Sequence, residues 1–399
     1  MKKVAKENFF YWALCLVIMT LPFPKYSLNS QSIILLFISW LFFNNYSDKL
    51  NNLKKMKLPF FIMSSMFWIS LLSLFYSSDI EIVIDIIIQN LPFLILPLII
   101  FTTIRDGRTL IQIIKIFSFS VIIASLFGIA KAFYFKINNL GDFFYYTEFS
   151  RVIEIHTTYF ALFVMISIVY FLFDIFKSKE LRIWFSIIGI IFLLAILYII
   201  SSRISLIALF VSCLFFLMSN LIVGVSKYKK GIFLLLSIIT YISFMLSPNF
   251  QNRNSGISKF GYQTPSLESR LIHWEAVINT IKSNNLMVGI GIKGGYENLY
   301  EEYLRIGFEQ GYRYKYNAHN QFLESVLSFG ILGLLSLSFI FMFSFYKAIK
   351  SKDSIAIIII MVFFIFMLTE SILVRHSGII SFVILMSLLL CRTTKYNLT

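Results

Sequence analysis

The chain has 399 residues, of which 58% are hydrophobic and only 14% are charged, and its mean hydropathy is +0.81. Soluble globular domains carry about 25% charged residues, so this composition excludes that class and indicates a membrane protein. A net charge of +15 would suggest nucleic-acid binding in a soluble protein. Here the cations lie mostly in short loops between apolar runs, where they indicate membrane orientation, so we expect no nucleic-acid partner.

Long apolar runs recur from one end of the chain to the other. A helix needs about 20 apolar residues to cross a hydrocarbon core about 30 Å thick, and most of these runs are near that length. We therefore predict an all-α polytopic membrane protein with about 12 transmembrane helices. The expected spans are residues 9–23, 32–46, 58–76, 83–101, 110–134, 157–176, 183–200, 204–224, 231–248, 321–346, 354–373 and 377–391.

Basic residues alternate from loop to loop along this series of spans. Clusters such as those around Lys54 and Lys347 fall in every second loop, and the loops between them hold few cations. Because cytoplasmic loops are enriched in Lys and Arg, the alternation predicts that both termini are cytoplasmic. We expect a single integral membrane domain, with nine helices in residues 1–248, a large loop on the outer side at 249–319 and three helices in 320–399.

The polar stretch at 249–319 is much longer than an ordinary connection, and loops of this kind are usually functional. Within it, Thr264 suits the N-cap of a helix and Pro265 suits the first helical position. Apolar residues at helical spacing continue this helix as far as Ile281, and a second helix is expected from Tyr296 to Ile306. The loop is therefore predicted to be helical.

Two arginines and two carboxylates stand out because of where they lie. Arg203 is at the outer end of a span and Arg270 begins the first loop helix. The planar guanidinium group binds phosphate oxygens at two points, although an isolated interfacial arginine also reaches simply toward water. Asp85 and Glu370 fall inside predicted spans, where ionisable groups are expensive and often functional. Pairing of Glu370 with Arg375 inside the bundle is the structural alternative.

The four histidines are all expected on the outer side of the membrane. No HExxH or comparable spacing accompanies them, so we expect no metal site. The strongest local signal is the pair His319-Asn320, which stands at the mouth of a predicted helix, ahead of an apolar run with spaced glycines. An imidazole at the membrane–water boundary can accept a proton from an attacking hydroxyl group. The histidines are His156, His273, His319 and His376.

The pair His319-Asn320, followed by Gly330, resembles the signature of the O-antigen ligase and polymerase superfamily. The long outer loop just before the histidine fits the same superfamily. Its other matching features are Ser202-Arg203 leading a span, Arg270 and Trp274 ahead of Gly289 and Gly291, and the helix start at His156-Thr157-Thr158-Tyr159. The resemblance extends over most of the chain.

This resemblance implies a GT-C-like, metal-independent, inverting glycosyltransferase that needs no cofactor and takes its glycan from undecaprenyl pyrophosphate. Arg203 and Arg270 would hold the pyrophosphate of the donor, and His319 would activate or orient the acceptor hydroxyl. The accessory residues would be Asn320, His156 and Glu370. The resemblance also implies a bacterial inner-membrane protein, in contact with membrane lipids, whose active site faces the periplasm.

Three functions compete. The first is an O-antigen ligase that transfers a lipid-linked glycan to a lipid A core acceptor. The second is a polymerase that joins repeat units on the lipid carrier, and the glycine at position 333, where ligases often carry threonine, leaves this choice open. The third, from another class, is a secondary transporter that uses Asp85 or Glu370 for ion coupling. A secondary transporter is expected to show two repeated halves of its sequence. The single large outer loop of this chain breaks such symmetry.

Overall fold

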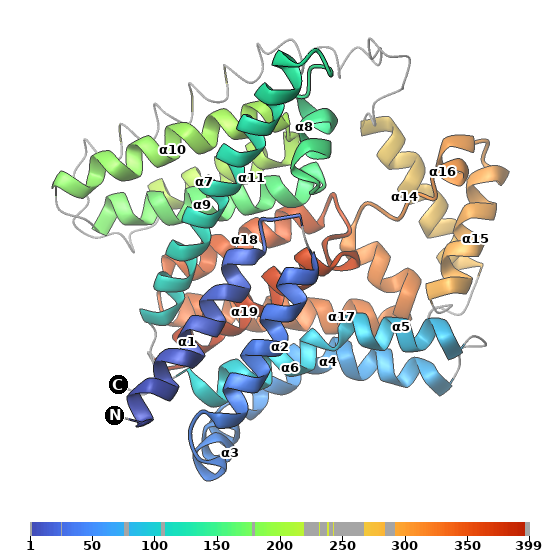
Figure 1. Cartoon of the computed structure of the whole chain (residues 1–399). Helices are drawn as coiled ribbons and strands as arrows, with labels where there is room; N and C mark the ends of the chain where they lie inside the picture. Colours follow the sequence, from blue (N-terminus) through green and yellow to red (C-terminus); the bar gives the residue numbers. More distant parts are fainter. Residues whose placement is uncertain are drawn as a thin grey trace.

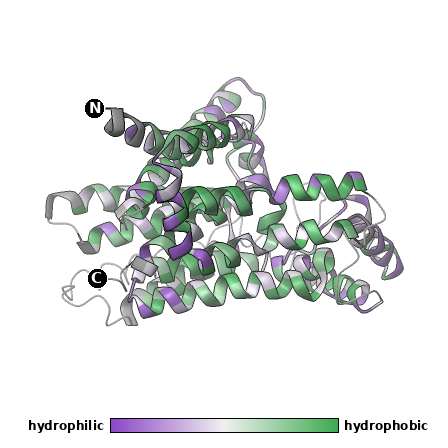
Figure 2. Cartoon of the chain, turned by 90° about the horizontal axis from the view of Figure 1, so that it is seen from below, coloured by the Kyte–Doolittle hydropathy of each residue, from purple (hydrophilic) through white to green (hydrophobic). Residues whose placement is uncertain are grey.

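The computed structural model describes residues 2–24, 26–75, 80–104, 108–177, 180–218, 267–283 and 292–395, together with the single positions 231, 238 and 242. Every regular element in these ranges is a helix (Figure 1). Apolar residues dominate the long helices, and polar residues are concentrated in the shorter helices and the connections (Figure 2). The predicted all-α class is therefore confirmed.

The helices fall into two groups along the chain. The first group is α1 (Lys2–Thr20), α2 (Tyr26–Phe42), α3 (Tyr46–Lys55), α4 (Lys57–Leu72), η1 (Ser73–Phe75), α5 (Ile80–Asn90), α6 (Pro92–Thr103), α7 (Arg108–Ile137), α8 (Tyr146–Ile153), α9 (Thr157–Lys177), α10 (Glu180–Ile200) and α11 (Arg203–Met218). The second group is α14 (Leu267–Lys282), α15 (Ile292–Arg305), α16 (Glu309–Arg313), α17 (Gln321–Lys350), α18 (Ser354–Met367), η2 (Ile372–Val374) and α19 (His376–Lys395).

The spans agree with a polytopic membrane protein. Among the described residues, seven helices are long and apolar enough to cross a membrane, or eight if the bent pair of α2 and α3 forms one span. Three shorter apolar helices coincide with further predicted spans: Asn8–Thr20, Arg203–Phe215 and Ser354–Met367. Each predicted span except 231–248 therefore has an apolar helix, and that exception falls almost wholly on residues outside the described ranges.

The boundaries predicted for the second span, 32–46, are wrong. The apolar helix α2 begins six residues earlier, at Tyr26, and after Phe42 the chain bends by 108° into α3. Residues Tyr46–Lys55 are mostly polar, so they cannot extend an apolar span. Lys49 reaches back from α3, and its ammonium group donates to the carbonyl oxygen of Trp40 over 2.5 Å. The bend is thus stabilised by a cation at the C-terminal end of α2.

The end of the span predicted at 354–373 is also wrong, because α18 stops at Met367. The side-chain amide of Asn320 donates to the carbonyl oxygen of Leu368 over 3.0 Å, which satisfies one of the acceptors exposed where a helix ends. Glu370 therefore lies in the connection between α18 and η2 rather than within a membrane helix. The chain is free there to turn the carboxylate toward other segments.

The helices form two cores. The larger core fills the bundle, where α9 and α19 are buried over most of their length while the other long spans expose roughly half or more of theirs. The smaller core joins α14, α15 and the start of α17 through Ala276, Leu299, Tyr303 and Leu327. Figure 1 shows α14, α15 and α16 gathered at one end of the molecule, beside α17. The small core therefore fixes α14 and α15 to the segment that precedes α17.

The predicted loop helices are confirmed in α14 and α15, while Thr264 and Pro265 lie outside the described residues. Farther along, α17 is bent at Gly330, whose φ of 63° and ψ of −156° are accessible to glycine and strained for other residues. The glycine that follows His319 in the sequence signature therefore has a backbone role. It lets α17 change direction after its first turns, which follow the segment that carries His319.

Candidate active site

His319 is held by a tight backbone arrangement at the mouth of α17. Its φ is 45°, and its backbone N–H donates to the side-chain oxygen of Asn317 over 3.0 Å. The next residue, Asn320, is the N-cap of α17, because its side-chain oxygen accepts from the N–H groups of Phe322 and Leu323 at 2.9 and 3.2 Å. The predicted placement of the His–Asn pair at a helix mouth is therefore confirmed.

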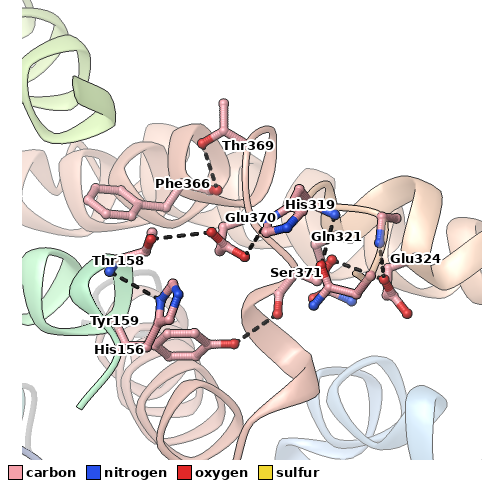
Figure 3. Close-up of polar contacts among 12 residues, drawn as sticks. His156, Thr158, Tyr159, His319, Gln321, Glu324, Phe366, Thr369, Glu370 and Ser371 are labelled. Atoms are coloured by element: carbon pink, nitrogen blue, oxygen red, sulfur yellow. Dashed lines mark hydrogen bonds and ion pairs between the residues drawn. The ribbon is translucent and has the colours of Figure 1, made fainter. Parts of the chain in front are cut away.

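The side chain of His319 meets a buried carboxylate. Its Nδ1 lies 3.1 Å from Oε1 of Glu370, and the other oxygen of Glu370 accepts from the hydroxyl group of Thr158 at 3.2 Å (Figure 3). Glu370 is only 5% exposed. His319 lies just before α17, Glu370 lies in the connection after α18, and Thr158 lies in the first turn of α9. The site therefore exists only in the folded bundle.

Ionisation of Glu370 decides how the proton of His319 is placed. Burial alone would raise the pKa of the Glu370 carboxyl, but the hydrogen bond and charge of His319 outweigh it and lower this pKa to about 2. An ionised carboxylate can only accept, so Nδ1 of His319 must carry the hydrogen of this bond. In the neutral imidazole the other nitrogen, Nε2, then has a free lone pair, which is what a general base requires.

A second buried carboxylate, Glu324 of α17, fixes the two segments that carry this pair. It accepts from the backbone N–H of Ala318 and from the hydroxyl group of Ser371, both at 3.0 Å, and also from the hydroxyl group of Tyr296. Ala318 precedes His319 and Ser371 follows Glu370. Glu324 therefore ties the neighbours of both site residues to one point, which preserves the geometry of the pair.

The structure brings three of the four histidines together. His156 precedes α9, its Nδ1 accepts from the N–H of Thr158 at 3.4 Å, and burial lowers its pKa while the charge of Glu370 acts the other way. His273 of α14 stacks on His319, with ring centroids 5.1 Å apart. His376 lies elsewhere, where its Nε2 is 2.9 Å from the side-chain oxygen of Asn29. The cluster around His319 thus takes in His156 and His273.

The two arginines occupy different places. Arg270 of α14 is partly buried, and its charge lowers the pKa of both Glu370 and His273, so it lies within electrostatic range of the histidine cluster. Arg203 is the first residue of α11, which packs against α18 and α9. The expected alternative pairing of Glu370 with Arg375 is not what forms, because Glu370 pairs with His319 and the guanidinium of Arg375 lies over the ring of Tyr159.

Asp85, the other carboxylate singled out from the sequence, is exposed on α5. The described residues contain no group of three or more His, Cys, Asp and Glu side chains that could hold a metal ion.

Sequence reasoning did not assign a role to three residues of the cluster: Thr158, Glu324 and His273. Thr158 belongs to the helix start His156-Thr157-Thr158-Tyr159, and Glu324 lies between His319 and Gly330 of the sequence signature. His273 carried a usable signal, because it lies one helical turn after Arg270 and so on the same face of α14. That spacing could have placed it beside Arg270 on one face of the predicted helix.

One comparison with known proteins bears on this arrangement. Residues 188–338 match the protein family described as O-Antigen ligase. The matched segment contains Arg203, Arg270, His319, Asn320 and Gly330. No curated protein matches the chain.

Proposed function

Because residues 188–338 support membership of the O-antigen ligase/polymerase superfamily, we propose that this protein is an inner-membrane glycosyltransferase that moves a glycan from undecaprenyl pyrophosphate to an acceptor hydroxyl. An O-antigen ligase/polymerase-type function is what the family match supports. The observation that carries the finer proposal is the contact between Nδ1 of His319 and the buried carboxyl group of Glu370. It leaves one imidazole nitrogen ready to take a proton.

In the proposed reaction the acceptor hydroxyl lies at Nε2 of His319. Its oxygen attacks the anomeric carbon of the donor sugar while its proton passes to Nε2, and the bond from that carbon to the pyrophosphate oxygen breaks. Direct displacement inverts the anomeric configuration. The imidazolium that forms is stabilised by the carboxylate of Glu370, which already accepts from the other ring nitrogen at 3.1 Å.

The leaving group is undecaprenyl pyrophosphate, on which negative charge develops as the bond breaks. Arg203 and Arg270 are proposed to bind its oxygens, because the guanidinium fork contacts two phosphate oxygens at once. Fixed cations of this kind stabilise developing charge in place of a metal ion. The position of Arg270 near the histidine cluster supports its part in this proposal.

Asn320 and His156 are proposed as accessory residues. Asn320 caps α17 and donates to the end of α18. It therefore sets the distance between the segments that carry His319 and Glu370. His156 caps α9 beside Thr158, which donates to Glu370. Both act on the orientation of the His319–Glu370 pair.

Among the two superfamily reactions we propose ligation to a lipid A core acceptor, and the test separates it from polymerisation. A deletion strain is complemented with the wild-type protein or with His319→Ala, and its surface glycans are profiled. A ligase predicts loss of surface glycan with long chains left on the lipid carrier in the deletion strain and with His319→Ala. A single repeat unit on the normal acceptor would instead identify a polymerase, and an unchanged profile would contradict both.

A further inference from the structure

His273 occupies a cage of rings behind the candidate base. It is 1% exposed, and its ring lies between 5.0 and 5.9 Å from the rings of Phe308, Tyr316 and Tyr303. The fourth ring in contact is that of His319, at 5.1 Å and an interplanar angle of 20°, which is the flattest of these contacts. His273 thus presents one face to His319 and is surrounded by aromatic groups elsewhere.

Neither ring nitrogen of His273 has a hydrogen-bond partner within the part of the chain that the structure describes, although both are buried. Leaving buried polar atoms unpaired costs free energy, and charging the ring in this cage would cost more. Burial, followed by the charges of His319 and Arg270, lowers the pKa of His273 to about 3. The ring is therefore neutral near pH 7 and acts through its flat face rather than its charge.

The stack of His273 on His319 also connects the proposed base with Arg270, which is proposed to bind the pyrophosphate of the donor. His273 lies one turn after Arg270 on α14, so both side chains project from one face of that helix. α14 packs against α17, at whose mouth His319 stands. Docking the ring of His273 on His319 therefore sets the position of Arg270 relative to the imidazole.

We propose that His273 is a positioning residue, whose buried planar ring holds the imidazole of His319 with Nδ1 toward Glu370 and Nε2 toward the acceptor. This inference rests on the proposed function of His319. A base must be held close to its productive geometry, and a misplacement of about 1 Å can cost about 100-fold in rate. The flat face of the His273 ring, stacked on His319, restrains the imidazole from rotating away from Glu370.

The first test compares His273→Phe and His273→Leu with Phe308→Leu as a matched control. Phe308 lies in the same cage and contacts the ring of His273, and its removal takes away an aromatic ring that does not stack on His319. We expect His273→Leu to lower kcat about 10- to 100-fold at nearly constant KM for the acceptor. His273→Phe keeps the flat face and is expected to stay within about threefold of wild type, as is Phe308→Leu.

The second test reads the tautomer of His319 directly and requires no activity. The chain has four histidines, so ¹⁵N-histidine labelling of the full-length protein in nanodiscs gives few signals, and loss of a signal in His319→Gln assigns His319. We expect the Nδ1–H tautomer in wild type and in His273→Phe, and a mixture of tautomers in His273→Leu. A merely structural role would lower the folded fraction without changing the tautomer of the folded protein.

Two outcomes would overturn the inference: unchanged kcat and tautomer in His273→Leu, or a loss in His273→Phe as large as that in His273→Leu, which would assign the role to a ring nitrogen. Failure of the proposed function looks different. In that case wild-type protein transfers no glycan, while the tautomer measurement still reports whether His273 orients His319.

Discussion

Nδ1 of His319 lies 3.1 Å from Oε1 of Glu370, although the two residues are 51 positions apart in the chain. One stands at the start of α17 and the other follows the end of α18. A neutral partner would orient the imidazole, but only a carboxylate also stabilises the positive charge that the imidazole acquires when it takes a proton. Glu370 therefore has two separable effects on His319, orientation of the ring and stabilisation of its positive charge. Substitutions of Glu370 can measure them separately.

Glu370→Gln removes the charge and keeps a side-chain oxygen that can accept from His319. General acid–base assistance contributes about 100- to 10,000-fold, so we expect the rate of glycan transfer to fall at least about 100-fold. The measurement is the initial transfer rate of protein reconstituted in liposomes with a lipid-linked glycan donor. A rate within about twofold of wild type, from protein with an unchanged melting temperature, would remove Glu370 from the mechanism.

Thr158→Val removes the hydroxyl group that donates to Glu370 over 3.2 Å. Hydrogen bonds to charged groups contribute about 1.5–3 kcal/mol, which corresponds to at least about tenfold in rate if the bond holds the carboxylate in place. The adjacent Thr157→Val is the matched control, because Thr157 also lies in the first turn of α9, where it is buried and Thr158 is half-buried. Equal kcat/KM for the two valine variants would show that the hydroxyl group of Thr158 does not support catalysis.

Glu324→Gln tests the anchor that holds the neighbours of His319 and Glu370. The amide cannot accept from Ala318, Ser371 and Tyr296 as the carboxylate does, so a buried donor is left without a partner. We expect a loss of about 1–3 kcal/mol in the free energy of unfolding. Unfolding in detergent by chemical denaturant measures it, with the exposed Glu309→Gln as control. Identical stability of these two variants would contradict the anchoring role.

Arg203→Lys and Arg270→Lys test binding of the donor pyrophosphate. A lysine keeps the charge but cannot make the two-point contact of a guanidinium group, so we expect transfer to fall about tenfold in each variant. The exposed Arg305 at the end of α15 pairs with Glu302. Arg305→Lys provides the control for replacing an arginine away from the histidine cluster. Full activity of either lysine variant, measured over a range of donor concentrations, would mean that a point charge suffices at that position.

His273 makes stability depend on pH. Its folded pKa of about 3 lies below the ordinary value of 6.5, so the unfolded chain binds a proton between these values and the folded chain does not. The folded state is therefore penalised increasingly as pH falls from 6.5 toward 3, by a few kcal/mol in total, and the penalty is absent above 6.5. His273→Phe should lose less stability than wild type between pH 7 and 4.5. Parallel losses in thermal unfolding would contradict a neutral, buried His273.

Most of the helical architecture could be predicted from the sequence, because membrane-spanning helices are recognised by the length and hydropathy of their apolar runs. The seven long spans and the mouth of α17 at His319-Asn320 were predicted. The bend after α2 was not, because apolar runs carry no signal for where a chain turns. The position of Glu370 outside a helix was also not predicted, because the apolar residues around it extended the predicted span beyond Met367.

The partners within the site were beyond sequence reasoning for a physical reason. His319 lies just before α17, Glu370 lies in the connection after α18, and Thr158 lies in the first turn of α9. Only the packing of these helices decides which carboxylate meets which imidazole. The sequence offered Arg375 as a partner for Glu370 because it is near in the chain. In the folded bundle Glu370 pairs with His319 instead, and the ring of His273 in α14 stacks on the same imidazole.

The role of His319 as the base is tested by the initial transfer rate of His319→Ala beside wild type and His376→Ala. Each protein is reconstituted in liposomes with an undecaprenyl-pyrophosphate-linked glycan and an acceptor. His376 is also a histidine on a helix start but lies outside the cluster. We expect His319→Ala to insert normally and to transfer no measurable glycan, while His376→Ala remains active. Transfer by His319→Ala at a rate close to wild type would contradict the role of His319 as the base.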